Sequence, residues 1–196
     1  MARDPYFDIL FEPVKIGPVT TKNRFYQVPH CSGMGNRMPN SLAAMRGMKA
    51  EGGWGVVHTE YCSIHITSDD MPYPYASLWD DADIAANALM TEKVHEHGAL
   101  AGVELWHGGA SSANLWSREA PIGTQSERAI YNDPVQSRIV NSADIKEIRR
   151  WHVAAARRAK AAGFDIMCIY ATHDYLIHGF LSPHRNFRSD EYGGSV

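Results

Sequence analysis

Four short apolar segments recur along the chain, and helical patterns follow most of them. Residues 24–29, 54–61, 99–106 and 164–170 have the length of strands and are nearly continuously apolar. The strands of a parallel sheet show this pattern because helices cover them, whereas half-exposed strands alternate polar and apolar residues. The recurrence therefore predicts an α/β fold, in which a parallel sheet carries helices on its outside.

Helices are predicted after the first two of these segments. The first is expected to begin at Ser41 as its N-cap and to end at Gly52, and the second to start from Asp80 or Asp81 and end at Gly98. Serine and aspartate favour the N-cap because their side chains accept hydrogen bonds from amides of the first helical turn.

The helix after the third segment has the clearest signals. Asn141 and Asp144 stand at capping-box spacing, and Gly163 stands where a terminating glycine belongs. Its predicted apolar stripe comprises Ile145, Ile148, His152, Ala155, Ala156 and Ala159. Such a stripe at helical spacing predicts one face packed against the sheet.

Two architectures fit this order: an open, doubly wound sheet and half of an eight-stranded barrel. A hairpin over residues 10–22, closed at Gly17-Pro18, precedes the first strand. A complete barrel typically needs ~250 residues, and the chain has 196. We therefore expect residues 1–196 to form the N-terminal half of a (β/α)8 TIM barrel, with about four β/α units plus the hairpin.

Charge and cysteine usage exclude several classes of protein. A net charge of −3 and a pI near 6.3 give no electrostatic reason to bind nucleic acid or an anionic membrane. The three cysteines are odd in number and widely spaced, which favours a reducing compartment over a disulfide framework. No leader peptide is recognised, and no run approaches the ~18 apolar residues of a membrane span. We expect a cytoplasmic protein.

Polar and reactive residues follow the predicted strands, at the end where barrel enzymes carry their active sites. They are Val28, Pro29, His30 and Cys31; Glu60 and Tyr61; Glu104, Trp106 and His107; and Tyr170, His173 and Tyr175. Segment 107–141, which follows the third strand, is long for a connection, and connections of this length are more often functional than mere links between elements.

From residue types alone, alternatives stay open at three of these positions. Cys31 is either a reactive thiol beside His30 or a buried small apolar residue, and spacing alone favours the latter. Tyr61 is either core packing or one wall of a ligand site. His173 is either a loop imidazole bonded to backbone or one of three titratable groups acting together.

Several long phrases resemble one family, the flavin-dependent old yellow enzyme class, and within it the bacterial amine dehydrogenases of the trimethylamine dehydrogenase type. The phrases are Lys22-Asn-Arg24-Phe, Arg24-Phe-Tyr-Gln-Val-Pro-His-Cys31, Ala50-Glu-Gly-Gly-Trp54, Thr59-Glu-Tyr-Cys62, Gly98-Ala-Leu-Ala-Gly-Val-Glu-Leu-Trp106, His173-Asp-Tyr175-Leu and Asn186-Phe-Arg-Ser-Asp-Glu-Tyr-Gly-Gly-Ser195. The resemblance covers nearly the whole chain and is weakest from Ser111 to Asn141.

The resemblance implies an FMN at the barrel mouth, bonded to Cys31 as 6-S-cysteinyl FMN. It also implies that Val28, Pro29, His30 and Glu104 contact the cofactor. Tyr61 is expected to form a wall of the amine site, together with Tyr170 and His173. Tyr170, His173 and Tyr175 are the implied catalytic residues, and no metal ligand is expected in this part of the chain.

The implied activity is oxidative N-demethylation of trimethylamine to dimethylamine and formaldehyde. Electrons are expected to pass through a 4Fe-4S cluster to an electron-transferring flavoprotein, in a protein that is a homodimer when full length. Residues 1–196 contain no closely spaced cysteine pair, so the cluster is expected in a C-terminal part absent from this sequence. The alternatives are a dimethylamine or histamine dehydrogenase, an ene-reductase or dienoyl-CoA reductase, and a truncated half barrel with little activity.

Overall fold

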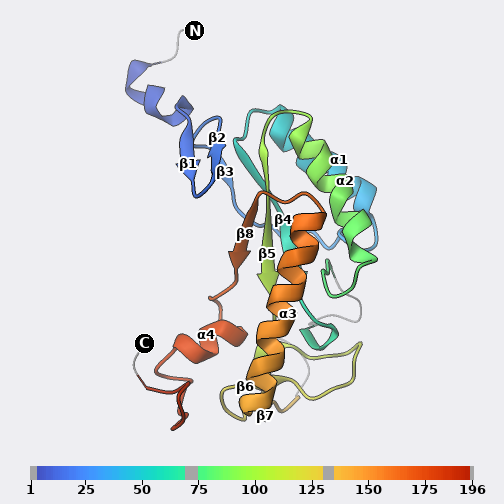
Figure 1. Ribbon diagram of the computed structural model, residues 1–196, viewed down its shortest axis with the longest axis vertical. Helices are drawn as coiled ribbons and strands as arrows, with labels where there is room; N and C mark the ends of the chain where they lie inside the picture. Colours follow the sequence, from blue (N-terminus) through green and yellow to red (C-terminus); the bar gives the residue numbers. More distant parts are fainter. Residues whose placement is uncertain (1–3, 69–74, 130–134, 195–196) are drawn as a thin grey trace.

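The computed structural model describes residues 4–68, 75–129 and 135–194. Its main sheet contains β3 (Tyr26–Gln27), β4 (Val56–Ser63), β5 (Leu100–Trp106) and β8 (Ile166–Ile169), which are parallel and stand side by side in chain order (Figure 1). The four predicted strands are confirmed, although β3 is shorter than expected. Pro29 has no amide hydrogen to donate, so the ladder of β3 does not continue through it.

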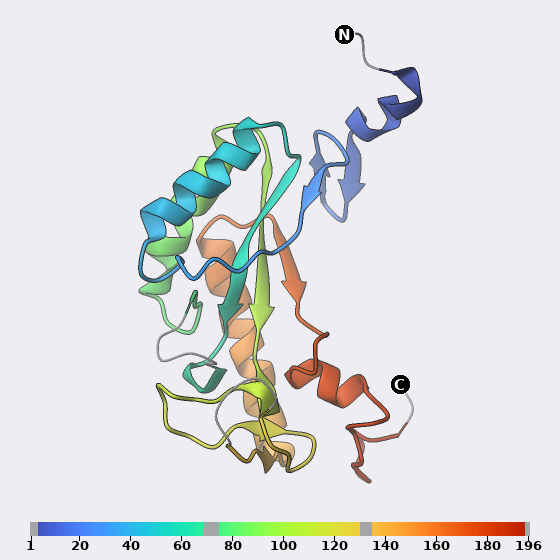
Figure 2. The ribbon, with the colours of Figure 1, turned by 180° about the vertical axis from the view of Figure 1, so that it is seen from behind.

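Three helices cover one face of this sheet. They are α1 (Pro39–Glu51), α2 (Asp83–His95) and α3 (Ser142–Ala161), and each follows one strand in the order β3, β4, β5 (Figure 1). Figure 2 shows the opposite face, over which no described helix lies. Helices on the outside of a curved parallel sheet, reached by successive β/α units, are the arrangement of half a barrel.

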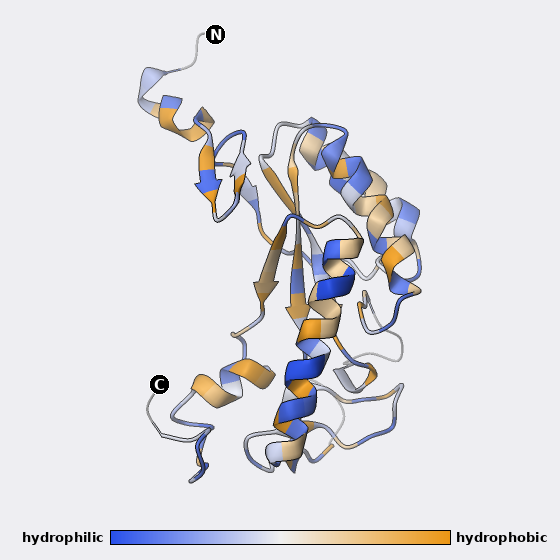
Figure 3. Ribbon diagram, in the orientation of Figure 1, coloured by the Kyte–Doolittle hydropathy of each residue, from blue (hydrophilic) through white to orange (hydrophobic). Residues whose placement is uncertain are grey.

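The core lies between the sheet and these helices. Val57, Val103 and Leu105 of the strands are fully buried there, against Val94 of α2 and Ala155 of α3. Apolar colour follows the strands in Figure 3, whereas α3 alternates between apolar and polar stretches. The predicted stripe of α3 is confirmed, since its apolar members are buried or half-buried, whereas Arg149, Arg150 and Arg157 are exposed.

The predicted caps of α1 and α2 are wrong. Helix α1 begins at Pro39 with Met38 as N-cap, two residues before Ser41. Proline favours the first helical position because its ring presets the helical φ and its missing N–H is not needed there. Helix α2 begins at Asp83, whose carboxylate accepts hydrogen bonds from the amides of Trp79 (2.9 Å) and Asp80 (3.2 Å).

The capping box of α3 is confirmed. Asn141 Oδ1 accepts hydrogen bonds from the amides of Ala143 (2.8 Å) and Asp144 (3.0 Å), and the Asp144 carboxylate accepts one from the amide of Asn141 (2.8 Å). The hydrogen bonds from Arg138 lower the pKa of Asp144, which keeps it charged at the helix N-terminus. Gly163 has a φ of +93° just beyond the C-terminus, as a terminating glycine requires.

The hairpin of β1 (Val14–Ile16) and β2 (Val19–Thr21) is also confirmed, with Gly17 at a φ of +56° in its turn. It stands at the amino end of the sheet, next to a 3-10 helix, η1 (Pro5–Phe11), that was not predicted (Figure 1). The hairpin is therefore on the far side of the molecule from the strand ends that carry the candidate site.

Segments at the carboxyl end of the strands contain small elements that the sequence did not indicate. They are η2 (Ile66–Ser68), η3 (Gly109–Ser111), β6 (Ile122–Gly123), β7 (Arg138–Ile139) and α4 (Leu176–Leu181). A second apolar cluster joins Ile122 of β6, Ile145 of α3 and Leu176 of α4, so β6 packs with both helices. None of the described helices combines the length and apolarity needed to cross a membrane.

Candidate active site

The predicted site residues are distributed along the carboxyl edge of the sheet, where the arrowheads of Figure 1 end. Val28, Pro29, His30 and Cys31 follow β3, Tyr61 lies in β4, Glu104 lies in β5, and Tyr170, His173 and Tyr175 follow β8. In the ladder, Tyr61 pairs with Glu104, and Glu104 pairs with Cys168. Paired residues of parallel strands share a face, so these three face away from the helices.

A β-bulge in β4 determines which of its side chains reach the site. The ladder pairs His58 with Gly102 and Tyr61 with Glu104, so two residues of β4, Thr59 and Glu60, oppose one residue of β5. The extra residue shifts the alternation of the strand by one. As a result Tyr61 shares the face of Glu104, while Cys62 is fully buried in the core under the helices.

Aromatic rings form a continuous row along the carboxyl edge. The centroid of Tyr61 lies 4.3 Å from that of Trp106, and Trp106 lies 5.1 Å from Tyr175 at 84°. Tyr75 extends the row at one end, 6.0 Å from Tyr61, and Tyr170 at the other, 5.1 Å from Tyr175. We call Tyr75, Tyr61, Trp106, Tyr175 and Tyr170 the aromatic row. Tyr75 was not among the predicted site residues.

Trp106 is the buried centre of the aromatic row. Its side chain is fully buried, yet its indole Nε1 has no hydrogen-bond partner among the described residues. A buried N–H without an acceptor is costly, and native structures rarely keep one. Trp106 lies between two tyrosine rings, two residues after Glu104. It therefore belongs to the site, although the resemblance gave it no role.

Tyr170 and His173 form a hydrogen-bonded pair at the end of β8. Tyr170 Oη lies 2.5 Å from His173 Nδ1, and Thr172 Oγ1 lies 2.8 Å from the same nitrogen. His173 and Asp174 have φ values of +55° and +61°, which non-glycine residues adopt only at an energetic cost. Tyr170 and His173 are therefore in contact at the site edge, where His173 is exposed.

Glu104 is half-buried on the same face. Burial raises the pKa of Glu104 to about 7, so the carboxyl is partly protonated near neutral pH. No described residue forms a hydrogen bond or ion pair with its carboxylate. The group is available to a ligand at the edge of β5.

The segment after β3 places Cys31 at the surface of the site edge. Cys31 is exposed, as is Val28 (64% exposed), whereas Cys62 is buried and Cys168 is half-buried in β8. Exposure removes the reading of Cys31 as a buried apolar residue and keeps the reading of a reactive thiol. Within the described residues, no three histidine, cysteine or acidic side chains are arranged to hold a metal ion.

Two buried charged residues lie near this segment, and neither was given a role in the predicted site. Arg46 of α1 and Glu60 of β4 are each 0% exposed, and both bond to the chain between residues 27 and 35. Glu60 lies at the end of a predicted strand, and this position indicated a site residue. Nothing in the sequence indicated Arg46, because only the fold brings it under the loop.

Two histidines are buried and uncharged. Burial lowers the pKa of His58 to about 4, and the positive charge of Arg46 adds to this effect. Burial lowers the pKa of His107 to about 3, and the nearby imidazoles of His65 and His152 add to this effect. His58 Nε2 lies 2.5 Å from Tyr26 Oη, and Gly102 packs against its ring so closely that a Cβ there would lie 2.3 Å from Nε2. His107 Nδ1 accepts a hydrogen bond from the amide of Gly109 (3.0 Å).

These histidines predict that the protein loses stability in mild acid. The unfolded chain takes up protons near pH 6.5 while the folded chain does not until about pH 4, so the stability is complete above pH 6.5 and falls below it. At pH 5 each histidine should cost about 2 kcal/mol relative to pH 7. Urea unfolding between pH 7 and 5 measures this, and His107→Gln should reduce the slope. The control His97→Gln removes an exposed imidazole and should leave the slope unchanged.

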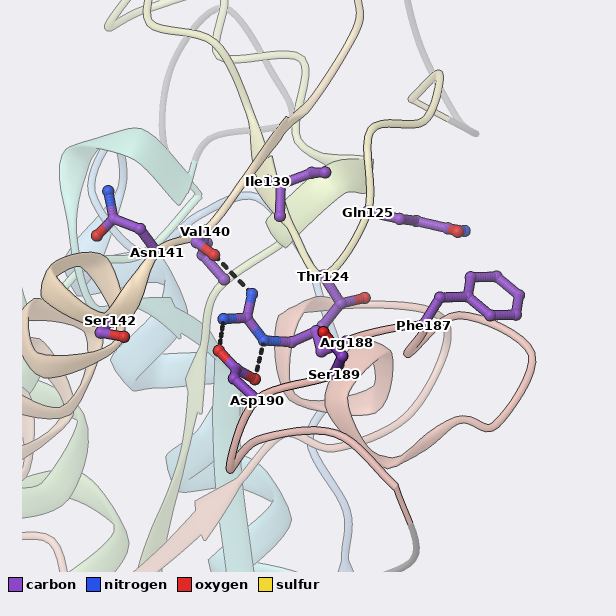
Figure 4. Close-up of a pocket in the computed structure, with 10 residues that line it drawn as sticks. All are labelled: Thr124, Gln125, Ile139, Val140, Asn141, Ser142, Phe187, Arg188, Ser189 and Asp190. Carbon is purple, nitrogen blue, oxygen red and sulfur yellow. Dashed lines mark hydrogen bonds and ion pairs between the residues drawn. The ribbon is translucent and has the colours of Figure 1, made fainter.

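A groove of about 470 Å³ is lined by residues 124–125, 139–142 and 187–190 (Figure 4). The Arg188 side chain crosses it, as Figure 4 shows, donating to the Asp190 carboxylate and, at 2.6 Å, to the carbonyl of Val140. Its guanidinium is therefore engaged within the chain. The hydrogen bond from Arg188 to Val140 links residues 186–194 to the start of α3. This role is structural.

Comparisons with known proteins follow this geometry. Residues 9–196 match the family described as NADH:flavin oxidoreductase / NADH oxidase. Dimethylamine dehydrogenase of Hyphomicrobium sp. (strain x) is 46% identical over 201 residues, covering 100% of this chain and 27% of that protein. The solved structure of histamine dehydrogenase from Rhizobium sp. 4-9 is 49% identical with a TM-score of 0.94, covering 98% of this chain and 30% of its own.

A second solved structure is similar to the same degree. It is 6-hydroxypseudooxynicotine amine oxidase from Pseudomonas geniculata N1, 48% identical with a TM-score of 0.94, over 98% of this chain and 29% of its own. The chain thus spans less than a third of the length of each of these relatives. The predicted fold, the N-terminal half of a TIM barrel, is confirmed by this likeness.

Proposed function

Because the chain belongs to the NADH:flavin oxidoreductase / NADH oxidase family, we propose that the full-length protein is a flavin-dependent dehydrogenase of a small methylated amine. Trimethylamine is the proposed substrate, and dimethylamine and formaldehyde are the products. The observation that carries the proposal is the aromatic row, with Tyr61 and Trp106 4.3 Å apart at its centre. A trimethylammonium has a single N–H, and the rest of its charged surface is covered by methyl groups, which aromatic faces bind by cation–π attraction and apolar contact.

The residues of this edge fit FMN as cofactor. Residues 28–31 are largely exposed beside the aromatic row, and the Glu104 carboxyl is half-buried with no described hydrogen-bond partner. Such a carboxyl can accept a hydrogen bond from a ring N–H, or donate one to a ring carbonyl when protonated. FMN, when bound, supplies the two-electron acceptor that amine oxidation requires. Residues 1–196 are then the N-terminal part of a flavin-binding barrel, with the phosphate site in further sequence.

Cys31 is the proposed covalent attachment point, giving 6-S-cysteinyl FMN. With FMN bound, the Cys31 thiol would lose its proton and its sulfur would replace one hydrogen of a ring carbon, also lost as a proton, while an acceptor such as dioxygen would take the two electrons. The exposed thiol on the site edge supports this assignment, and His30 precedes it in the same exposed turn.

Tyr170, His173 and Tyr175 are the proposed catalytic residues. The 2.5 Å contact between Tyr170 Oη and His173 Nδ1 makes a pair that can hold or release one proton. Amine oxidation needs a neutral nitrogen lone pair while a C–H bond of the methyl group breaks, so this pair would take the ammonium proton. The resulting iminium hydrolyses to formaldehyde and the secondary amine. An ene-reductase binds the carbonyl oxygen of its substrate at this place, whereas an amine has no such oxygen. The tyrosine at position 170 therefore supports amine chemistry over ene-reduction.

Electrons are proposed to leave through a 4Fe-4S cluster in further sequence to an electron-transferring flavoprotein. A homodimer in the cytoplasm is the proposed state of the full-length protein. No disulfide joins the described cysteines, which supports a reducing compartment.

Anaerobic mixing with amines tests the proposed function. Full-length protein is mixed with trimethylamine, dimethylamine or histamine, and the visible absorption of the flavin is followed. We expect trimethylamine to bleach the flavin fastest. Faster bleaching by dimethylamine or histamine would identify the corresponding dehydrogenase instead. Bleaching by NADPH and by none of the amines would replace the proposal with an ene-reductase or dienoyl-CoA reductase.

Substitution of Tyr61 tests the aromatic row separately. Tyr61→Gln in the full-length protein should lower kcat/KM for trimethylamine about 30-fold, because a desolvated cation–π contact contributes about 2 kcal/mol. Tyr61→Phe keeps the π face and is the matched control, expected within about threefold of the parent. Equal kcat/KM in the glutamine variant would remove Tyr61 from the amine site.

A further inference from the structure

Two buried, oppositely charged side chains hold the segment that carries Cys31. Arg46 comes from α1 and Glu60 from the bulge of β4, and both are 0% exposed. Buried charges are rare unless they are paired and hydrogen-bonded, because removing them from water is costly. Their arrangement around one short loop therefore requires an explanation.

Glu60 binds the part of the loop that follows Cys31. Its Oε2 accepts hydrogen bonds from the amides of Ser32 (2.6 Å) and Gly33 (2.7 Å) and from Ser32 Oγ (3.1 Å), and its Oε1 accepts one from the amide of Gly35 (2.7 Å). The carboxylate comes so close to Gly35 that a Cβ there would lie 2.7 Å from Oε1. Three backbone amides of this loop are therefore fixed by one side chain.

Arg46 binds the part of the loop that precedes Cys31. Its Nη2 donates to the carbonyl of His30, and its Nη1 donates to Gln27 Oε1 at 3.2 Å. The carbonyl of His30 belongs to the same planar peptide unit as the amide of Cys31. Arg46 therefore fixes the orientation of the peptide from which Cys31 projects.

The charge of Arg46 also acts on the thiol. Burial lowers the pKa of Arg46, and its attraction to Glu60 and to Cys31 opposes that effect. A guanidinium stays protonated in proteins, so the loop contains a permanent positive charge in surroundings of low polarity. A nearby positive charge favours the thiolate, which is the nucleophilic form of cysteine.

We propose that Arg46 is a positioning residue for the covalent attachment of the flavin to Cys31, holding the His30–Cys31 peptide and stabilising the Cys31 thiolate. Glu60 completes the arrangement by fixing the loop on its other side and balancing the buried charge. The inference rests on the proposed covalent bond and assigns this chain a residue that drives its formation. A purely structural role for Arg46 predicts a different dependence on pH.

The test compares rates of attachment in the full-length chain, prepared without flavin and then mixed with FMN in air. Flavin that stays with acid-precipitated protein is measured over time between pH 6 and 10. Arg46→Gln should slow attachment at pH 7 roughly 10- to 100-fold, because the Cys31 thiolate loses the positive charge that favours it. Alkaline pH should restore the rate of Arg46→Gln. At pH 7 the rate of Arg46→Lys should lie between those of Arg46→Gln and the parent protein. Lys49→Gln is the control, since Lys49 lies on the same helix and donates no hydrogen bond to this loop in the described structure.

Three outcomes would overturn the inference. Attachment at the parent rate in Arg46→Gln would show that the guanidinium is not needed. A deficit of equal size at every pH, accompanied by weaker reversible FMN binding, would reduce Arg46 to a structural role. If the parent protein carries no acid-stable flavin while amines still bleach it, the covalent bond fails and the amine dehydrogenase function survives.

One further measurement does not depend on the variants folding. In the flavin-free parent protein, the rate of alkylation of Cys31 by iodoacetamide is followed by mass spectrometry as a function of pH. We expect its midpoint below the value of about 8.5 that is usual for a cysteine. A midpoint at or above that value would contradict the role given to Arg46.

Discussion

Replacing Cys31 by alanine in the full-length protein should eliminate acid-stable flavin, from nearly all of the bound flavin to none. The physical reason is that alanine has no nucleophilic atom, while the backbone of residues 28–35 remains fixed by Arg46 and Glu60. FMN should therefore still bind, and acid should release it. The measurement is the flavin absorption of the supernatant and of the pellet after acid precipitation.

Two other cysteines provide matched controls for this experiment. Cys168→Ala and Cys62→Ala remove thiols that lie within β8 and in the buried core, and both should retain acid-stable flavin. Acid-stable flavin persisting in Cys31→Ala would assign the bond to another side chain. Loss of all flavin binding in that variant, without acid, would instead indicate that Cys31 contributes to the shape of the site.

Glu60→Ala is expected to destabilise the protein by about 3–5 kcal/mol, the usual cost of removing one partner of a buried charged network. Its loss leaves the half-buried amides of Ser32 and Gly33 and the buried amide of Gly35 without their acceptor, and leaves Arg46 as an uncompensated buried charge. Urea unfolding followed by tryptophan fluorescence measures the difference. The loop of residues 28–36 should also become a site of cleavage by added protease before the rest of the chain unfolds.

Glu96→Ala is the matched control, since Glu96 forms an exposed ion pair with Lys93 at 2.7 Å. Exposed pairs contribute at most about 1 kcal/mol, so this variant should unfold close to the parent. If Glu60→Ala and Glu96→Ala unfold at the same urea concentration, the hydrogen bonds of Glu60 do not stabilise the folded protein.

The sheet was predictable because each strand has its own local signal. A run such as Val56 to Tyr61 contains enough β-branched and aromatic residues to be recognised without knowledge of its neighbours. The capping box of Asn141 and Asp144 was equally local, with both partners within four residues. Ser41 failed because a stronger local signal, Pro39, starts α1 first, and Asp83 acts from inside α2 rather than ahead of it.

The parts of the site that escaped prediction depend on contacts between distant segments. Arg46 and Glu60 meet residues 27–35 only after α1, β3 and β4 have packed together. Tyr75 joins the aromatic row from a loop with no regular pattern. The helix α4 has six residues and no side-chain cap, so no periodicity could reveal it. In contrast, the residues at the strand ends were visible because a parallel sheet gathers them at one edge.

The bulge in β4 has a consequence for how proteins of this kind can diverge. It sets the face that each residue near the end of the strand takes: Tyr61 faces the open side of the sheet beside Glu104, and Glu60 faces the loop that holds the thiol. Substitutions at position 61 can therefore alter the accepted ligand without disturbing the loop. A change in the length of the strand could not, because deleting one residue would exchange the two faces. Among descendants of this sequence, we expect the spacing of β4 to be inherited more strictly than the identity of the residue at its tip.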